Sequence, residues 1–134
     1  MIFFAIPGVC VAKARARVLK SGRSYTPAKT ANYAARVAKI GAMAIGDAPM
    51  LAGPLELSLT VYLPIPASWS RKKRDSALSG GVWPLSRPDV DNYAKNICDA
   101  LNGVLWGDDS QIVRLTCAKV YSDDPRAVVK VTAI

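Results

Sequence analysis

A run of alternating apolar and polar residues in the middle of the chain limits the fold most strongly. Apolar side chains occupy every second position from Leu55 to Leu63, and Glu56, Ser58 and Thr60 stand between them. Because successive side chains of a strand point to opposite faces, this period of two predicts a half-buried β-strand over residues 55–63. A strand of this kind needs a core that covers its apolar face.

Other segments predict further strands and helices around this one. Strands are expected at residues 1–6, 11–18, 111–121 and 127–133. A helix is expected over residues 27–44, with Thr26 as N-cap and Pro27 at the first helical position. Two further helices are expected, one over residues 69–78 with Ser68 as N-cap, and one over residues 91–102 with Asp91 or its neighbour as N-cap. A chain of 134 residues with this pattern fits one α+β domain, residues 1–134, with a mixed sheet of about four to five strands and two main helices.

The charge of the chain points to a polyanionic partner. Its 18 Lys and Arg residues outnumber 10 Asp and Glu, for a net charge of +8. Two segments concentrate the cations that we take as candidate DNA contacts, namely Lys13, Arg15 and Arg17 in the first segment and Arg71, Lys72, Lys73 and Arg74 in the second. Basic stretches supply much of the sequence-independent affinity for phosphate backbones, which favours nucleic acid over an anionic membrane or a merely solvated surface.

Residue types that are absent or scarce exclude several kinds of site. The chain has no His, and its three cysteines, Cys10, Cys98 and Cys117, are far apart in sequence. A Cys/His zinc site and a catalytic mechanism with an imidazole base are therefore excluded. The amino terminus lacks the pattern of a signal peptide, and no apolar run is long enough to span a membrane. We expect a cytoplasmic protein with reduced thiols and no membrane partner.

Two short acidic clusters stand out against this basic background. Asp89 and Asp91 form the first cluster and Asp108 and Asp109 the second, so that four of the ten acids fall within 21 residues. Carboxylate oxygens are the ligands that Mg²⁺ prefers. Spacing alone leaves another interpretation open, in which the clusters are helix caps and turns and Lys95 is a surface ion-pair partner.

A family pattern appears when these residues are taken together. Three parts of the chain, taken in order, resemble the signature of the RusA-type Holliday junction resolvases. They are the opening Arg87-Pro88-Asp89-Val90-Asp91-Asn92, the following Lys95, and the block Asp99-Ala100-Leu101-Asn102-Gly103-Val104-Leu105-Trp106-Gly107-Asp108-Asp109-Ser110-Gln111. Ile6-Pro7-Gly8 and Tyr25-Thr26-Pro27-Ala28 resemble members of this family too, many of which are encoded by phages and prophages. Residues 81–85 depart from the pattern of many relatives.

The resemblance implies a magnesium-dependent homodimeric endonuclease, with Mn²⁺ as a possible substitute, that nicks four-way junction DNA symmetrically during recombination and repair. It implies Asp89, Asp91 and Asp109 as metal-binding catalytic carboxylates, with Asp108 as an alternative in a shifted register, and Lys95 as a functional lysine. Asn92 belongs to the motif and is a candidate DNA contact. Two alternatives stay open, a broader nuclease of flaps and other branched DNA and a non-catalytic basic DNA-binding protein.

Overall fold

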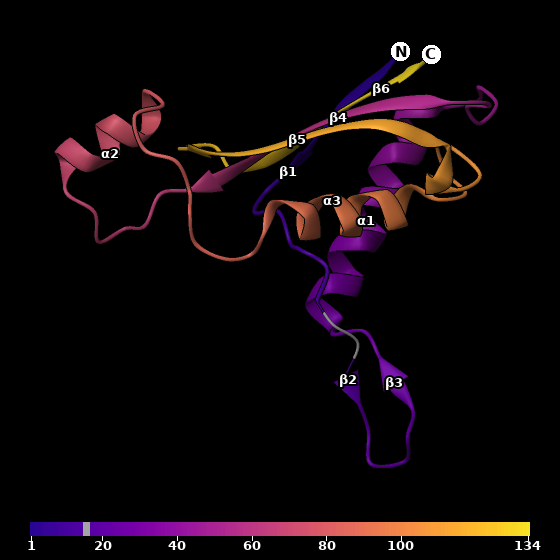
Figure 1. Cartoon of the computed structure of the whole chain (residues 1–134), viewed down its shortest axis with the longest axis horizontal. Helices are drawn as coiled ribbons and strands as arrows, with labels where there is room; N and C mark the ends of the chain where they lie inside the picture. Colours follow the sequence, from indigo (N-terminus) through magenta and orange to yellow (C-terminus); the bar gives the residue numbers. More distant parts are fainter. Residues whose placement is uncertain (15–16) are drawn as a thin grey trace.

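The computed structural model describes residues 1–14 and 17–134 and consists of one main sheet with helices against one face and two projecting elements (Figure 1). In chain order the elements are β1 (Ile2–Pro7), β2 (Arg17–Val18), β3 (Ser24–Tyr25), α1 (Ala28–Ile45), β4 (Leu55–Pro64), α2 (Arg71–Leu78), α3 (Val90–Leu101), the 3-10 turn η1 (Asp109–Gln111), β5 (Ile112–Ser122) and β6 (Arg126–Ala133). None of the helices in the described ranges is long and apolar enough to cross a membrane.

The main sheet has four strands in the order β1-β6-β4-β5. β4 pairs in parallel with β5 and antiparallel with β6, and β6 pairs antiparallel with β1. A parallel pair needs a long crossover connection, and here α2, α3 and η1 lie in the chain between β4 and β5. The crossover is therefore the segment that carries both acidic clusters.

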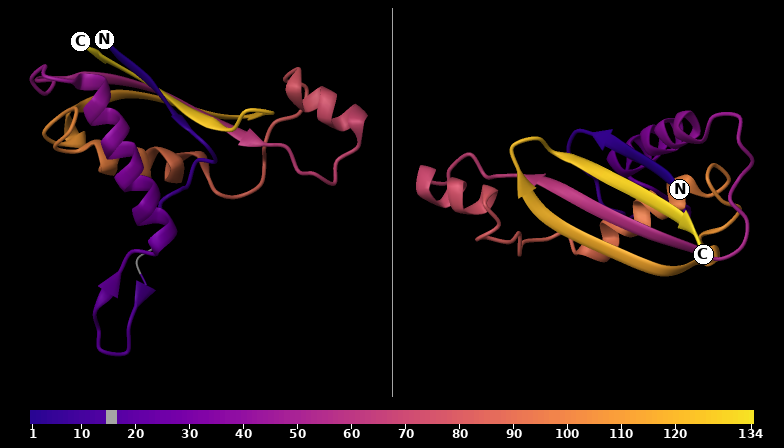
Figure 2. Two further views of the ribbon diagram at one scale, coloured as in Figure 1. Left: turned by 180° about the vertical axis from the view of Figure 1, so that it is seen from behind. Right: turned by 90° about the horizontal axis from the view of Figure 1, so that it is seen from above.

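The core lies between the sheet and the helices α1 and α3 (Figure 2). Leu55, Leu57, Leu59 and Val61 of β4 are buried, as their alternation predicts. Gly41 lets α1 approach α3 closely, since a Cβ atom at this position would stand 2.5 Å from Cδ2 of the buried Leu101. This close packing holds α3 against the sheet, where it can present its first turn as part of a site.

The predicted fold class and the main elements are confirmed, but three helix caps are wrong. α3 begins at Val90, so its N-cap is Asp89, whose backbone is extended, and not Asp91 or its neighbour. Pro27, not Thr26, is the N-cap of α1. α2 begins at Arg71, with Ser70 as N-cap rather than Ser68, because the hydroxyl of Ser70 accepts a hydrogen bond from the backbone N–H of Lys73 at 3.3 Å. A hydroxyl that accepts a hydrogen bond from the backbone N–H three residues later is the usual arrangement of a side-chain N-cap.

The predicted strand over residues 11–18 is also wrong. Its first part lies across α3 and has no regular structure, because the N–H of Lys13 bonds to the carbonyl of Asn92 at 2.9 Å and the side chain of Asn96 donates to the carbonyl of Val11 at 2.9 Å. Among the described residues of the segment, Arg17–Val18 alone forms a strand, β2, which pairs with β3. Arg15 lies outside the described residues.

Candidate carboxylate site beside helix α3

A pocket of about 330 Å³ lies where α3 meets β5 and the turn that precedes it. Its lining residues come from the crossover and the first part of β5, and they are Asp91, Asn92, Ala94, Lys95, Cys98, Asp109, Ile112 and Leu115. The chain returns from the end of α3 to place Asp109 in the same pocket as Asp91 and Lys95. Residues from both acidic clusters therefore meet in space.

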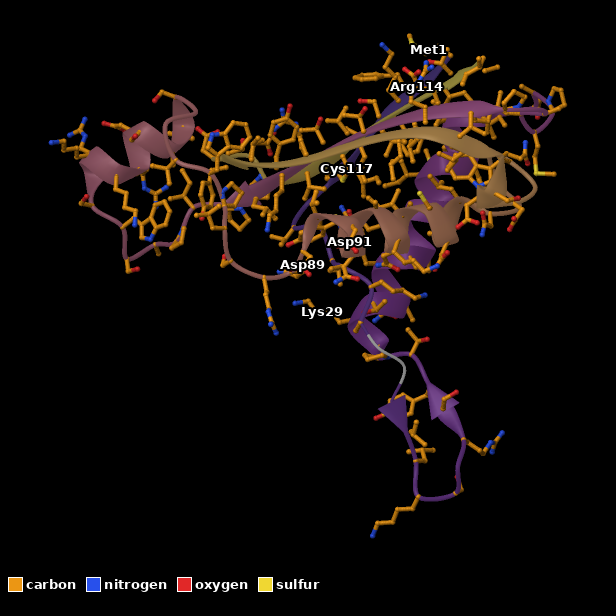
Figure 3. All side chains as sticks on the ribbon, in the orientation of Figure 1. Met1, Lys29, Asp89, Asp91, Arg114 and Cys117 are labelled. Carbon is orange, nitrogen blue, oxygen red and sulfur yellow. The ribbon has the colours of Figure 1, made fainter. Side chains whose placement is uncertain are left out.

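α3 supplies the first part of this pocket through its helical period. Asp91 is in the first turn of α3 and Lys95 follows four residues later, so the two side chains lie on the same face. Figure 3 shows Asp89 and Asp91 at the N-terminal end of the helix, with Cys117 on the sheet. Asp89 is the exposed N-cap residue and is not among those that line the pocket.

The structure thus brings two of the three predicted carboxylates together with the predicted lysine. Across residues 1–14 and 17–134, no group of three or more His, Cys, Asp or Glu side chains is arranged to hold a metal ion. Two carboxylates, those of Asp91 and Asp109, and the amide of Asn92 nevertheless offer oxygen ligands from one pocket. This is a ligand set that Mg²⁺ accepts, because Mg²⁺ is commonly bound by one or two carboxylates with water and substrate phosphate.

Asp108 and Asp109 are neighbours with different surroundings. Asp108 is the N-cap of η1, where one carboxylate oxygen accepts a hydrogen bond from the backbone N–H of Ser110 at 3.2 Å. Hydrogen bonds from the side chain and backbone of Ser110 lower the pKa of the Asp108 carboxyl group below its ordinary value. The structure therefore gives Asp108 a capping role and leaves Asp109 to line the pocket.

Gln111 ties the second acidic cluster to a distant part of the chain. Its side-chain amide donates to the carbonyls of Leu51 and Gly53, both at 3.1 Å, while its oxygen accepts from the N–H of Gly107 at 2.9 Å and of Asp108 at 3.3 Å. A glutamine amide has two N–H donors and one oxygen with two lone pairs, so all its bonding capacity is used. Gln111 fixes the loop that positions Asp109.

Trp106 anchors the same loop from inside the core. Its side chain is fully buried, and its indole N–H donates to the side-chain oxygen of Asn102 at 2.7 Å. The carbonyl of Trp106 also accepts from the N–H of Gly103 at 2.7 Å. Sequence reasoning assigned no role to Trp106 or Gln111, although both belong to the motif, which was the available signal.

Lys95 takes part in a small ion-pair network along α3. Asp99 accepts from the side chain of Lys95 at 3.4 Å and pairs with the ammonium of Lys13 at 3.5 Å. The side chain of Lys95 is 61% exposed, so its pair with Asp99 contributes little to stability. Lys95 can therefore reorient toward an anion in the pocket at small cost, whereas Lys13, predicted as a DNA contact, also packs along α3.

Two thiols close to the carboxylates are held in the protonated form. Burial, followed by the negative charge of Asp109, raises the pKa of the Cys98 thiol to about 12. Burial, Cys10 and then the charge of Asp91 raise the pKa of the Cys117 thiol to about 11. Since the thiolate is the reactive form, burial lowers the reactivity of both thiols near neutral pH.

Apart from Lys13, the described residues of the predicted basic surface lie on the two elements that project from the core. On α2, Arg71, Lys72 and Lys73 are exposed and Arg74 is half-buried. Arg17 lies in β2 of the hairpin. Figures 1 and 2 show α2 beyond one end of the sheet and the hairpin extending from the helix side, with α3 in the angle between them. α3, which supplies part of the carboxylate pocket, thus lies between two projecting elements that carry basic residues.

Comparisons with known proteins find a matching family model and similar proteins. Residues 7–132 match the model of the family described as "Endodeoxyribonuclease RusA". The chain is 36% identical to "Uncharacterized protein YqaN" of Bacillus subtilis (strain 168), over 99% of this chain and 96% of that protein. It is 37% identical to "Crossover junction endodeoxyribonuclease rusA" of Lactococcus phage r1t, over 60% of this chain and 56% of that protein.

Proposed function

The chain belongs to the RusA family of endodeoxyribonucleases, and from this premise we propose that it is a magnesium-dependent Holliday junction resolvase. In this proposal it makes paired symmetrical nicks in opposing strands of four-way DNA junctions during recombination and repair. One observation carries the proposal: Asp91, Lys95 and Asp109, from separate parts of the crossover, line one pocket in an otherwise basic protein.

The proposed metal would be held by carboxylates of the pocket. Asp91 and Asp109 are the two ligands that the geometry supports, with Asn92 beside them. Asp89 is proposed as a third ligand on the family resemblance, from its position at the N-terminus of α3. When bound, Mg²⁺ supplies Lewis-acid polarisation of the phosphate and lowers the pKa of an attacking water. Mn²⁺ prefers the same oxygen ligands and is expected to substitute.

The residues of the chain itself would hold and orient the scissile phosphate. Among the described residues, the side chain of Asp89 makes no capping hydrogen bond, and of the first-turn N–H groups that of Asn92 donates to the Asp89 carbonyl at 3.1 Å. The N–H groups of Val90 and Asp91 would then face a phosphate oxygen. Lys95 lies one turn further along the same helix and would oppose the negative charge that develops on the phosphate during hydrolysis. These two features are independent of the identity of the metal.

The stoichiometry follows from the symmetry of the reaction. A four-way junction cut at two related positions requires two active sites, and each chain offers one pocket lined by both Asp91 and Asp109. A homodimer related by a twofold axis supplies the second site. We propose such a dimer acting in the cytoplasm of a bacterial cell, with phage or prophage origin proposed from the resemblance.

The decisive experiment is cleavage of a synthetic mobile four-way junction, with linear duplex and flap DNA as controls. We expect paired nicks in Mg²⁺, none in EDTA, and loss of cleavage with retained binding in Asp91→Asn. Asp123→Asn, an exposed turn residue away from the pocket, is the matched control and should cleave as the wild type does. Asp89→Asn tests separately whether a carboxylate outside the pocket lining is required.

Other outcomes would redirect the proposal. Cleavage by Asp91→Asn at the wild-type rate would remove that carboxylate from the mechanism. Equal cutting of junction and flap would indicate a broader nuclease of branched DNA. Tight junction binding by the wild-type protein without any cleavage would indicate a basic DNA-binding protein that has no nuclease activity.

A further inference from the structure

A second cleft lies beside α2, the helix that stands beyond one end of the sheet in Figure 1. It has a volume of about 270 Å³ and lies between the last residues of α2, the loop that follows, and the neighbouring strands β4 and β5. Three of its lining side chains are aromatic: Tyr62 of β4, Tyr121 of β5 and Trp83 of the loop. None of these residues belongs to the carboxylate pocket.

One cation lies over a ring that lines this cleft, and a second lies over a ring that packs against the lining. The guanidinium of Arg126 lies 3.8 Å from the ring centroid of Tyr62. The ammonium of Lys73 lies 3.9 Å from the ring centroid of Trp69, which in turn packs edge-on against Tyr121 at a centroid distance of 5.1 Å. Aromatic rings that alternate with cations are the arrangement by which proteins bind unpaired nucleotides, since rings stack on bases and cations neutralise phosphates.

Trp83 is held in an exposed position by a fixed loop. Its side chain is 60% exposed, although it lines the cleft. At one end of the loop the N–H of Gly81 bonds to the carbonyl of Ser76 at 2.8 Å. At the other end the ammonium of Lys119 donates to the carbonyls of Ser86 at 2.9 Å and Pro88 at 3.0 Å. A large exposed ring on an anchored loop is available for stacking without a large ordering cost.

We propose that this aromatic cleft binds an unpaired nucleobase at the branch point of the DNA substrate. Trp83 stacks on the base, while Arg126 and the exposed cations of α2 face the flanking phosphates. The same loop continues directly into Asp89, so a base held at Trp83 would set the position of the strand relative to the carboxylate pocket. The inference rests on the proposed action on branched DNA and adds a second contact to it.

The test measures binding of the full-length protein to an immobile four-way junction that carries 2-aminopurine at the branch point, in EDTA to prevent cleavage. We expect Trp83→Ala to weaken binding about five- to a hundredfold, the range that one base–aromatic stack provides. The slope of log affinity against log salt should not change, because no charge is removed. Lys72→Ala should instead reduce that slope. The 2-aminopurine fluorescence should be quenched by the wild type but not by Trp83→Ala.

Leu85→Ala is the matched control, since Leu85 is a 91% exposed apolar residue of the same loop and does not line the cleft. Trp83→Phe keeps an aromatic face and should recover most of the affinity. If Trp83→Ala binds the junction and affects 2-aminopurine as Leu85→Ala does, the cleft does not hold a base. If Trp83→Phe is as weak as Trp83→Ala while both variants keep wild-type circular dichroism, stacking is not the interaction.

Cleavage in Mg²⁺ by the same protein preparations separates this inference from the proposed function. A wild type that cleaves junctions, together with a Trp83→Ala variant that binds them normally, would overturn the base-binding cleft alone. A wild type that never cleaves, together with a Trp83→Ala variant that loses affinity and quenching, would support the cleft and overturn the nuclease.

Discussion

Replacement of Gln111 by alanine removes four hydrogen bonds that hold the loop of Asp109 in place. The glutamine amide joins Leu51 and Gly53 on one side to Gly107 and Asp108 on the other, at distances from 2.9 to 3.3 Å. The exposed partners regain hydrogen bonds to water, so each bond contributes toward the lower end of the usual net range of about 0.5–1.5 kcal/mol. We therefore expect a loss of about 2–3 kcal/mol in the free energy of unfolding.

The assay for this loss is thermal or urea unfolding of the purified protein. For a domain of this size a loss of 2–3 kcal/mol should lower Tm by about 6–12 °C. Asn32→Ala removes an exposed amide on α1, away from the loop, and should unfold as the wild type does. Equal unfolding of Gln111→Ala and Asn32→Ala would refute the assigned hydrogen bonds.

The functional readout distinguishes positioning from general stability. Gln111 does not line the carboxylate pocket, but its loop carries Asp109 into it. Below the unfolding range, Gln111→Ala should lower kcat for junction cleavage about ten- to a hundredfold, since misplacement of a catalytic group by about 1 Å costs rate. The Kd for the junction should stay unchanged. A variant that cleaves at the wild-type rate would show that Asp109 needs no support from this loop.

Two further predictions follow from the acidic pair and the buried thiols. Asp108→Asn should keep both the capping hydrogen bond and cleavage, because asparagine is as good an N-cap as aspartate. Asp109→Asn should abolish Mg²⁺-dependent cleavage. Junction cleavage assays of the two variants compare them directly. Burial raises the pKa values of the Cys98 thiol to about 12 and of the Cys117 thiol to about 11, from an unfolded value of 9.0. The protonated thiols therefore stabilise the folded state fully below about pH 9, and this stabilisation declines as pH rises toward the folded pKa values. Urea midpoints at about pH 8 and pH 10 should show the decline, and it should shrink in Cys98→Ala.

Local sequence patterns were sufficient to predict the helices and strands whose apolar residues recur with a strong period. The alternation from Leu55 to Leu63 predicted β4, since its apolar positions face a core that covers one side of the sheet. Helical spacing likewise placed Asp91 and Lys95 on one face of α3. The alternation over residues 11–18 failed because its apolar positions are alanines, which bury little surface. Hydrogen bonds to α3 therefore determined the path of that segment instead.

Features that depend on distant contacts could not be predicted from local patterns. The return of Asp109 to α3 relies on Gln111, which bonds to carbonyls 58 and 60 residues earlier in the chain. The aromatic cleft combines side chains from β4, β5 and the loop after α2, and each aromatic residue alone resembles an ordinary core or surface residue. The family signature predicted the candidate site because it combines residues that are far apart in the chain, without giving their geometry.

The roles of Asp108 and Asp109 show why geometry had to come from the structure. The two residues are chemically identical neighbours, and either could be the ligand when only their order in the motif is known. Asp108 has an extended backbone, with φ of −150° and ψ of 146°, and its carboxylate turns toward the N–H of Ser110. Asp109 begins the 3-10 turn, and its side chain therefore projects in another direction, into the pocket with Asp91. The capping bond of Asp108 thus leaves Asp109 as the neighbour that lines the pocket where we propose a metal ion.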